Sequence, residues 1–214
     1  MILAREFYAR PTLDVLREII GKVLVHGVGG RAAAGIIVEA EAYIGESDPA
    51  CHAAPGPTRR NRPLYGPPGR AYVYLNYGIH NLMNAVTEEE GFPAAILIRA
   101  LEPVEGLPLM RRRRGTPDQS LCRGPGNLTV ALGITRRQNT AVLTDGGALR
   151  IEDRGVRPPS LSWSPRIGIR VGTDRLWRCS WEGNQAVSGR SNGPRSTVHG
   201  AVRRSMGADH AGRP

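Results

Sequence analysis

The sequence contains almost no lysine: Lys22 is the only one among 29 basic residues, and arginine supplies the rest. The three cysteines are far apart and form no CxxC pair, which argues against a disulfide framework or a zinc site. No apolar run approaches the roughly 20 residues that span a bilayer, and the N-terminus lacks the apolar core of a signal peptide. We therefore expect a cytosolic protein (nuclear in a eukaryote) with no membrane association, metal or cofactor.

The charge that is present is strongly one-sided. The net charge is +10 and the isoelectric point is about 10.5. Such an excess indicates an anionic partner, with nucleic acid as the first expectation and a membrane surface as the alternative. No amphipathic helix rich in Leu and Phe is visible, and there are only two Phe in the chain. Composition therefore favours nucleic acid, whose phosphates suit the planar fork of arginine.

Apolar periodicity and turn residues predict one α+β domain over residues 1–182, with a largely antiparallel sheet. Residues 183–214 are rich in Gly, Ser, Asn, Arg and Pro, so we expect a disordered basic tail there. Residues 44–70 read as a long loop of the kind that is often functional. The predicted strands are 22–26, 33–43, 72–77, 79–87, 94–101, 149–152 and 166–171, and the predicted helices are 11–20, 103–114 and 125–132.

Two of the most apolar predicted strands carry a charged residue, Glu41 in one and Arg99 in the other. Ionised side chains are rarely buried unless they pair with a partner or act on one. Side-chain alternation places Glu39, Glu41 and Tyr43 on the same face of their strand. Half of the six tyrosines lie between the two runs, in residues 72–77. The combination suggests chemistry on a flat ring that is attached to an anionic polymer.

These residues belong to an ordered set of motifs that closely resembles the alkyladenine (3-methyladenine) DNA glycosylases, the single-domain type found in vertebrates and many bacteria. The set spans about residues 5 to 180, and its core is Glu41-Ala42-Tyr43, His52, Tyr72-Val73-Tyr74, Tyr77-Gly78, Asn84 and Arg99-Ala100-Leu101-Glu102-Pro103. The resemblance implies a curved antiparallel sheet flanked by helices, with a protruding β-hairpin. It also implies a monomer that acts on double-stranded DNA containing damaged purines.

The resemblance further implies the reaction: a damaged purine is flipped out of the duplex, and its bond to deoxyribose is hydrolysed to leave an abasic site. Expected substrates are 3-methyladenine and 7-methylguanine, with hypoxanthine left open. Glu41 matches the general base, Arg99 matches the arginine that helps hold the attacking water, and the backbone carbonyl of Ile167 matches a further water contact. A purely structural ion pair is the alternative for Glu41 and Arg99, and Glu39 is the competing carboxylate.

By the same resemblance, Tyr43, His52 and Tyr74 match the pocket that sandwiches the flipped base, where aromatic faces attract cationic alkylpurines. Asn84 matches a residue that crowds the amino group of guanine. Tyr77 matches the wedge that fills the gap left in the duplex. The alternatives are core packing for the strand tyrosines, a turn contact for Asn84 and a capping role for Tyr77.

Two basic runs remain, 58–62 and 111–114. We expect Arg59, Arg60 and Arg62 to contact the DNA backbone, and leave the second run open because it also fits a solvated helix end. Lys22 lies far in sequence from the pocket motifs, so we expect hydrolysis alone, without the amine nucleophile of a strand-cleaving lyase. The rival interpretations are a basic protein that binds distorted DNA without cutting it and an unrelated transferase. Segments 79–81 and 177–181 depart from the family pattern.

Overall fold

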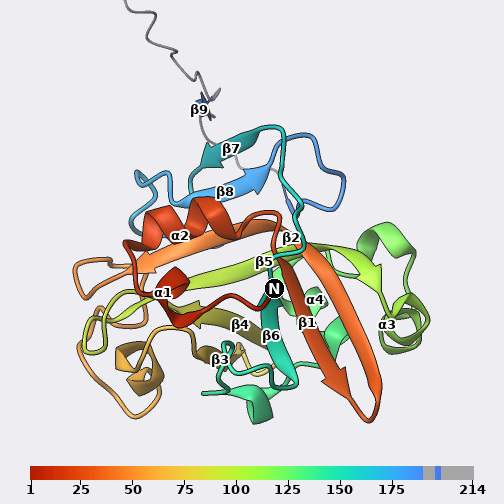
Figure 1. Cartoon of the computed structure of the whole chain (residues 1–214). Coiled ribbons are helices and arrows are strands. Elements are labelled where there is room, and N and C mark those ends of the chain that lie inside the picture. Colours follow the sequence, from red (N-terminus) through yellow and green to blue (C-terminus); the bar gives the residue numbers. More distant parts are fainter. Residues whose placement is uncertain (190–195, 199–214) are drawn as a thin grey trace, which may run out of the picture.

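The computed structural model describes residues 1–189 and 196–198 and has a curved antiparallel sheet at its centre (Figure 1). The strand order is β3-β4-β5-β2-β8-β7-β9, and β1 and β6 extend the sheet from β2. Every strand pairing is antiparallel, as the sequence predicts. The strands are β1 (Val23–Val28), β2 (Arg31–Ile44), β3 (Ala71–Asn76), β4 (His80–Val86), β5 (Ala94–Glu105), β6 (Leu149–Glu152), β7 (Leu161–Ser164), β8 (Arg178–Trp181) and β9 (Ser196–Val198).

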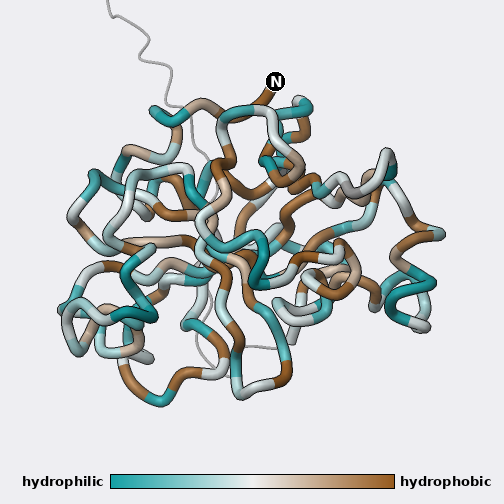
Figure 2. Tube along the Cα trace, turned by 90° about the horizontal axis from the view of Figure 1, so that it is seen from below, coloured by the Kyte–Doolittle hydropathy of each residue, from teal (hydrophilic) through white to brown (hydrophobic). Residues whose placement is uncertain are grey.

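The helices cover one face of this sheet. They are α1 (Arg5–Tyr8), α2 (Thr12–Ile19), α3 (Leu107–Arg114) and α4 (Pro125–Leu132), with short 3₁₀ turns at η1 (Arg62–Tyr65), η2 (Asp118–Ser120) and η3 (Arg136–Gln138). Leu16 of α2 and Leu128 of α4 share one hydrophobic core with Ile96 and Ile98 of β5. In Figure 2 hydrophobic stretches run through the middle of the molecule, and most outer loops are hydrophilic. Because strand side chains alternate, the neighbours of these core residues point to the other face.

The two long strands β2 and β5 pair along most of their length and form the centre of the sheet. Their pairing has register shifts on either side of Glu39, which mark a bulge in β2. A bulge bends a strand and increases its local twist, which suits the curvature of the sheet. The β3–β4 hairpin turns at Tyr77 and Gly78, whose φ angles are 48° and 73°. Positive φ at both central residues is what a tight hairpin turn demands, and the predicted protruding hairpin is confirmed.

Two predicted elements are wrong. The helix expected over 103–114 begins only at Leu107, because Pro103 to Glu105 continue β5 as a strand. Gly106 ends that strand with a φ of 76°, and a Cβ at this position would collide with the backbone of Ala32. The strand expected over 166–171 is an irregular segment, because its Ile167 N–H donates to the Glu41 side chain instead of to a strand. The strands in this part of the chain are β7 and β8.

The segment 183–189 at the start of the predicted tail packs onto the domain. Ala186 and Ser188 are 8% and 6% exposed. Residues 190–195 and 199–214 of the predicted tail lie outside the described residues. Within the described part of the chain, no helix is both long and apolar enough to cross a bilayer.

Candidate active site

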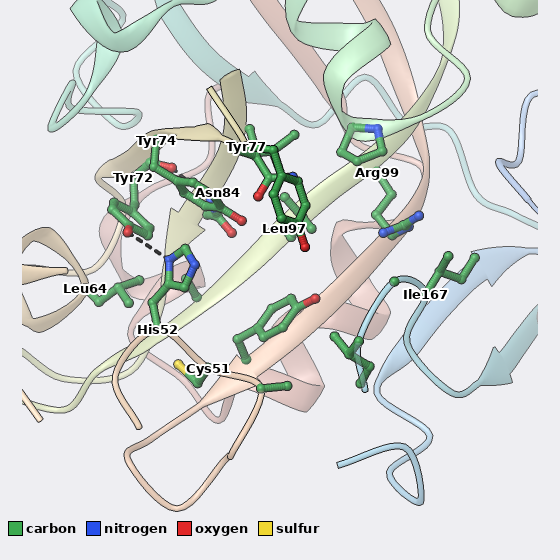
Figure 3. Close-up of a pocket in the computed structure, with 18 residues that line it drawn as sticks. Cys51, His52, Leu64, Tyr72, Tyr74, Tyr77, Asn84, Leu97, Arg99 and Ile167 are labelled. Carbon is green, nitrogen blue, oxygen red and sulfur yellow. Dashed lines mark hydrogen bonds between the residues drawn. The ribbon is translucent and has the colours of Figure 1, made fainter. Parts of the chain in front are cut away.

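A cavity of about 400 Å³ opens on the face of the sheet opposite the helices. Its walls come from strands β2 to β5, the loop around His52, the irregular segment that begins at Ile167, Leu64 of η1 and Pro125 at the start of α4. Figure 3 shows Arg99 and Ile167 on one side of the cavity and His52, Tyr72 and Tyr74 on the other. A cavity of this size accommodates a small organic ring system.

The two charged residues singled out in the apolar strands meet beside this cavity. Glu41 and Arg99 lie on neighbouring strands, with Arg99 Nη1 3.3 Å from Glu41 Oε2. Glu41 also accepts hydrogen bonds from the Ile167 N–H at 2.7 Å and from the Tyr43 hydroxyl at 2.9 Å. Glu41 is fully buried, and it lies behind the cavity wall that Arg99, Tyr43 and Ile167 form.

The groups around Glu41 act on the pKa of its carboxyl in opposite directions. Burial raises the pKa of its carboxyl above the usual value, because an apolar surrounding disfavours the charged form. The charge of Arg99 and the hydrogen bonds from Ile167 and Tyr43 oppose this shift without reversing it. The pKa of Arg99 is raised, since Glu41 and Glu39 outweigh the effect of burial. A raised carboxyl pKa makes Glu41 a better proton acceptor when it is ionised.

The opposite wall of the cavity is an aromatic cluster. The ring centroids of His52 and Tyr74 are 4.5 Å apart, and those of Tyr72 and Tyr74 are 5.2 Å apart. The Tyr72 hydroxyl lies 3.0 Å from His52 Nδ1. Tyr43, at the end of β2, contributes a further ring to the lining. The cavity therefore exposes several aromatic faces to whatever enters it, rather than filling itself with them.

Burial and the nearby Arg60 lower the pKa of His52, so its ring is neutral at pH 7. Burial raises the pKa of Tyr72 to about 12, which keeps its hydroxyl protonated. When that hydroxyl donates to Nδ1, the hydrogen of His52 sits on Nε2, leaving a donor on the imidazole for a ligand.

Asn84 lies at the base of the cavity, and its Nδ2 donates to the Tyr72 carbonyl at 3.0 Å. It is 4% exposed and contacts strand backbone rather than a turn, so the turn alternative is wrong. The side-chain oxygen Oδ1 of Asn84 forms no hydrogen bond within the described residues. The amide is thus fixed by one end, and a rigid group can reject a ligand by steric conflict.

Tyr77 projects from the tip of the β3–β4 hairpin with 88% of its surface exposed, and it also borders the cavity (Figure 3). Its neighbour Ile79 is 73% exposed. Two large apolar side chains at an exposed tip are unusual without a function, because burial normally stabilises such groups. The capping alternative does not describe this residue, because its ring is exposed and its hydroxyl makes no hydrogen bond within the described residues.

The basic loop borders the same opening. Arg59, Arg60 and Arg62 are all exposed. Arg60 lies over the Tyr74 ring at 5.6 Å from its centroid, which places it at the rim. The loop is held by Asn61, which donates to the carbonyls of His52 and Gly56 at 2.7 and 2.9 Å. Sequence reasoning missed this anchor, although an asparagine in a loop of Arg residues is a recognisable turn signal.

The second basic run, 111–114, is largely used within the protein. Arg111 pairs with Asp118, and Arg113 donates to the Ala131 carbonyl. Arg114 donates to the Leu121 carbonyl. This run therefore joins α3 to its neighbours. Lys22 pairs with Asp153 at 2.6 Å and does not line the cavity. Within the described residues, no three His, Cys, Asp or Glu side chains gather into a metal-binding group.

Sequence reasoning also missed a fully buried ion pair behind Tyr43. Arg166 Nη2 donates to Asp48 Oδ1 at 2.8 Å, and both side chains have no exposed surface. The guanidinium of Arg166 also lies 4.7 Å from the centroid of the Tyr43 ring. The pair fixes the ring from behind and anchors the segment that supplies Ile167.

Comparison with known proteins identifies the family. The family model described as Methylpurine-DNA glycosylase (MPG) matches residues 6–185. A protein of Chlorobium phaeobacteroides is 47% identical over 194 residues, covering 89% of this chain and 97% of its own length. One of Methanocella arvoryzae is 46% identical over 197 residues, covering 90% and 98%. Both are named "Putative 3-methyladenine DNA glycosylase". The chain therefore belongs to the methylpurine-DNA glycosylase family.

Proposed function

We propose that this protein is a monofunctional 3-methyladenine DNA glycosylase that removes alkylated purines from duplex DNA by hydrolysis at the cavity beside Glu41. Family membership supplies the reaction class, base excision repair of alkylated purines. The observation that carries the assignment to this site is the contact between Glu41 and Arg99 behind an open aromatic cavity. Its substrate lies in genomic DNA, and we propose that it acts as a monomer.

In the proposed reaction Glu41 accepts the proton of a water whose oxygen attacks C1′ of the damaged nucleotide. The bond between C1′ and the base nitrogen breaks, and its electron pair leaves with the base. Arg99 and the carbonyl of Ile167 hold the water, which explains why both residues border the cavity. An ionised carboxylate has about four lone-pair sites, so the existing contacts of Glu41 leave room for one more donor.

The aromatic wall explains the choice of base. A purine alkylated at a ring nitrogen carries positive charge, and the faces of Tyr43, Tyr74 and His52 attract such a ring. A cationic base is also a better leaving group, so moderate catalysis is enough. Asn84, fixed by its bond to Tyr72, crowds the exocyclic amino group of guanine. We propose 3-methyladenine and 7-methylguanine as substrates.

The surface around the opening has the character of a DNA interface. The exposed Tyr77 replaces the flipped nucleotide in the duplex stack, and Arg59, Arg60 and Arg62 contact the phosphates on either side. Within the described part of the chain no lysine lines the cavity to form a Schiff base, because Lys22, the only lysine in the sequence, is paired with Asp153 elsewhere. The proposed product is therefore an abasic site in an uncut strand.

Replacing Glu41 with Gln tests the function. The amide keeps the size of the side chain and cannot take a proton from water, so single-turnover excision of 3-methyladenine or 7-methylguanine should fall by about 1,000-fold or more. Binding to the same duplex, measured by fluorescence anisotropy, should stay within about threefold of the parent protein. Excision close to the parent rate would refute the role of Glu41. Binding by the parent without any excision would favour a non-catalytic binder.

Replacing Tyr77 with Ala tests the wedge. The loss of one stacking side chain should weaken binding to damaged duplex by about 1–3 kcal/mol, or roughly 5- to 150-fold. Excision from a single strand, which needs no wedge, should change far less. The Val104→Ala variant is the control, because it removes an exposed apolar side chain that does not border the cavity. Equal binding by the Tyr77 variant and the parent would show that Tyr77 is not the wedge.

A further inference from the structure

Glu39 is a second buried carboxylate near Glu41, and the proposed reaction gives it no role. It has no exposed surface and does not line the cavity. Its Oε1 accepts from Arg99 Nε at 2.9 Å and from Arg178 Nε at 2.7 Å, and its Oε2 accepts from the Ser188 N–H at 2.6 Å. A carboxylate with this many strong donors is fixed in place.

The contact with Arg99 decides where that guanidinium points. A guanidinium is planar, so a bond at Nε fixes its plane and the direction of its two terminal nitrogens. With Nε held by Glu39, Nη1 of Arg99 stops 3.3 Å from Glu41, a looser contact than the 2.9 Å to Glu39. Arg99 is therefore shared between two carboxylates instead of closing fully onto the proposed base.

The other side of Glu39 is held by the C-terminal part of the domain. Arg178 donates from Nη1 to Ser164 Oγ at 2.8 Å and from Nη2 to the Ser188 carbonyl at 3.1 Å. Strand β8 carries Arg178 directly opposite Glu41 on β2. The segment 183–189 thus reaches the proposed base through a continuous series of buried polar contacts, rather than merely covering the sheet.

The four charges also balance. Glu39 and Glu41 are fully buried, and Arg99 and Arg178 are only 7% and 4% exposed. Two anions and two cations in one buried cluster leave no net charge when Glu41 is ionised. Buried charges are tolerated only when they are paired and hydrogen-bonded, so removing Glu39, which both arginines contact, disturbs the positions of Arg99 and Arg178.

We propose that Glu39 is a positioning residue for the glycosylase reaction, which holds Arg99 in the orientation that leaves Glu41 free to accept a proton, and that Arg178 and the backbone of Ser188 form the brace for Glu39. This inference rests on the proposed function of Glu41. Without the brace Arg99 closes onto Glu41 as a direct ion pair, occupies the lone pair that the water needs, and moves away from the water site.

The test is the double variant Glu39→Gln/Arg178→Gln, which removes one negative and one positive charge and so keeps the cluster neutral. Single-turnover excision should fall by about 100-fold, because a displacement of about 1 Å in catalytic geometry has that effect. Binding to damaged duplex should remain within about threefold of the parent. A closer Arg99 also favours the ionised form of Glu41, so the acidic limb of the excision profile should move to lower pH.

That pH shift distinguishes positioning from general destabilisation, because loss of stability would not move the limb. The groups that face Glu41 and set its protonation are Arg99 on β5, Tyr43 and Glu39 on β2, the Ile167 N–H, Arg166 and Tyr74. The double variant replaces Glu39 and also Arg178, which lies opposite Glu41 on β8, and keeps every other residue of this set. The matched control is Lys22→Gln/Asp153→Asn, which removes another ion pair that does not line the cavity. This control should excise at the parent rate.

Excision by the Glu39/Arg178 variant at the rate of the control would overturn the proposal.

If the double variant does not fold, the Arg178→Lys variant provides the test, because lysine keeps the charge but cannot contact Glu39, Ser164 and Ser188 together. It should lose about tenfold in excision rate, whereas Ser188→Ala should be harmless because Ser188 acts through its backbone. An unchanged Arg178→Lys rate overturns the proposal as well. An active Glu41→Gln variant would defeat the function itself, whereas an inactive one beside an unaffected double variant would defeat only the brace.

Discussion

Glu41 and Asp48 make an instructive comparison, because each is a fully buried carboxylate beside an arginine, and they lie only seven positions apart in the chain. Asp48 receives two nitrogens of Arg166 in a fork, with a backbone N–H from Ala50 in addition. Glu41 receives a single, longer contact from Arg99, together with one N–H and one hydroxyl.

The two carboxyl groups respond in opposite directions. Burial alone raises the pKa of Asp48, but the hydrogen bonds and charge of Arg166 outweigh it, so the net pKa is lowered. Burial raises the pKa of Glu41, and its weaker contacts do not overcome that shift. Neither side chain has exposed surface, but Glu41 is the more deeply enclosed, and Asp48 also accepts from the Ile44 and Ala50 N–H groups, so depth of burial and number of donors together decide the direction. A forked arginine produces a structural anchor, whereas an arginine shared between two acids leaves a carboxylate able to react.

The largest effect expected from this comparison is on stability. Asp48→Asn removes the charge that Arg166 needs, so the free energy of unfolding should fall by about 3–5 kcal/mol, as measured by urea denaturation at pH 7. Because the folded-state pKa of Asp48 is lowered, its stabilisation is present above the unfolded pKa of about 3.9 and is lost as pH falls through the folded value. The gap between variant and parent should therefore narrow in acid.

Glu41→Gln is the counterpart in the same measurement. Its raised pKa means that the folded protein already disfavours the charged form, so a neutral side chain should leave stability within about 1 kcal/mol of the parent or increase it. The expected pattern is thus an unstable Asp48 variant beside a stable but inactive Glu41 variant. Equal destabilisation of both variants would break the comparison, because both acids would then be structural.

Much of the arrangement around Glu41 could be predicted from the sequence. The apolar strands indicated that Glu41 and Arg99 each pair with a group or act on one, and the family resemblance indicated that they interact with each other. Alternation placed Glu39, Glu41 and Tyr43 on one face, and the contacts of Arg99 and Tyr43 agree with both. The antiparallel α+β fold and the hairpin that exposes Tyr77 are also confirmed. These features follow from local rules with periods of two residues or from turn chemistry, which one sequence is enough to reveal.

The contacts of Asp48 could not be predicted in the same way. Asp48 and Arg166 are 118 positions apart, and neither lies in a regular strand. The apolar pattern of 166–171 indicated a strand, but its N–H at Ile167 is committed to a side chain across the molecule. The hydrogen bond from the Ser188 N–H to Glu39 could not be predicted either, because the composition of the segment 183–189 resembles that of a disordered tail. Contacts between irregular segments leave no periodic signal in the sequence.

A smaller effect sharpens the comparison by changing one donor on Glu41. Tyr43→Phe keeps the aromatic ring, with its contact to Arg166, and removes the hydroxyl that donates to Glu41 at 2.9 Å. That hydrogen bond lowers the pKa of Glu41, so its loss should raise the pKa further. Since the ionised carboxylate is the proposed base, the acidic limb of the excision profile should move to higher pH, measured in single turnovers from about pH 5 to 9.

The matched control is Tyr72→Phe, which removes a hydroxyl from the same cavity that contacts His52 and not Glu41. Its acidic limb should remain at the position of the parent, whatever happens to base binding. A Tyr43→Phe limb that stays in place, or moves to lower pH, would mean that the hydroxyl does not tune Glu41. The contrast with Asp48 would then rest on Arg99 and on the deeper burial of Glu41, because the Tyr43 hydroxyl would no longer help to explain why the two pKa values move in opposite directions.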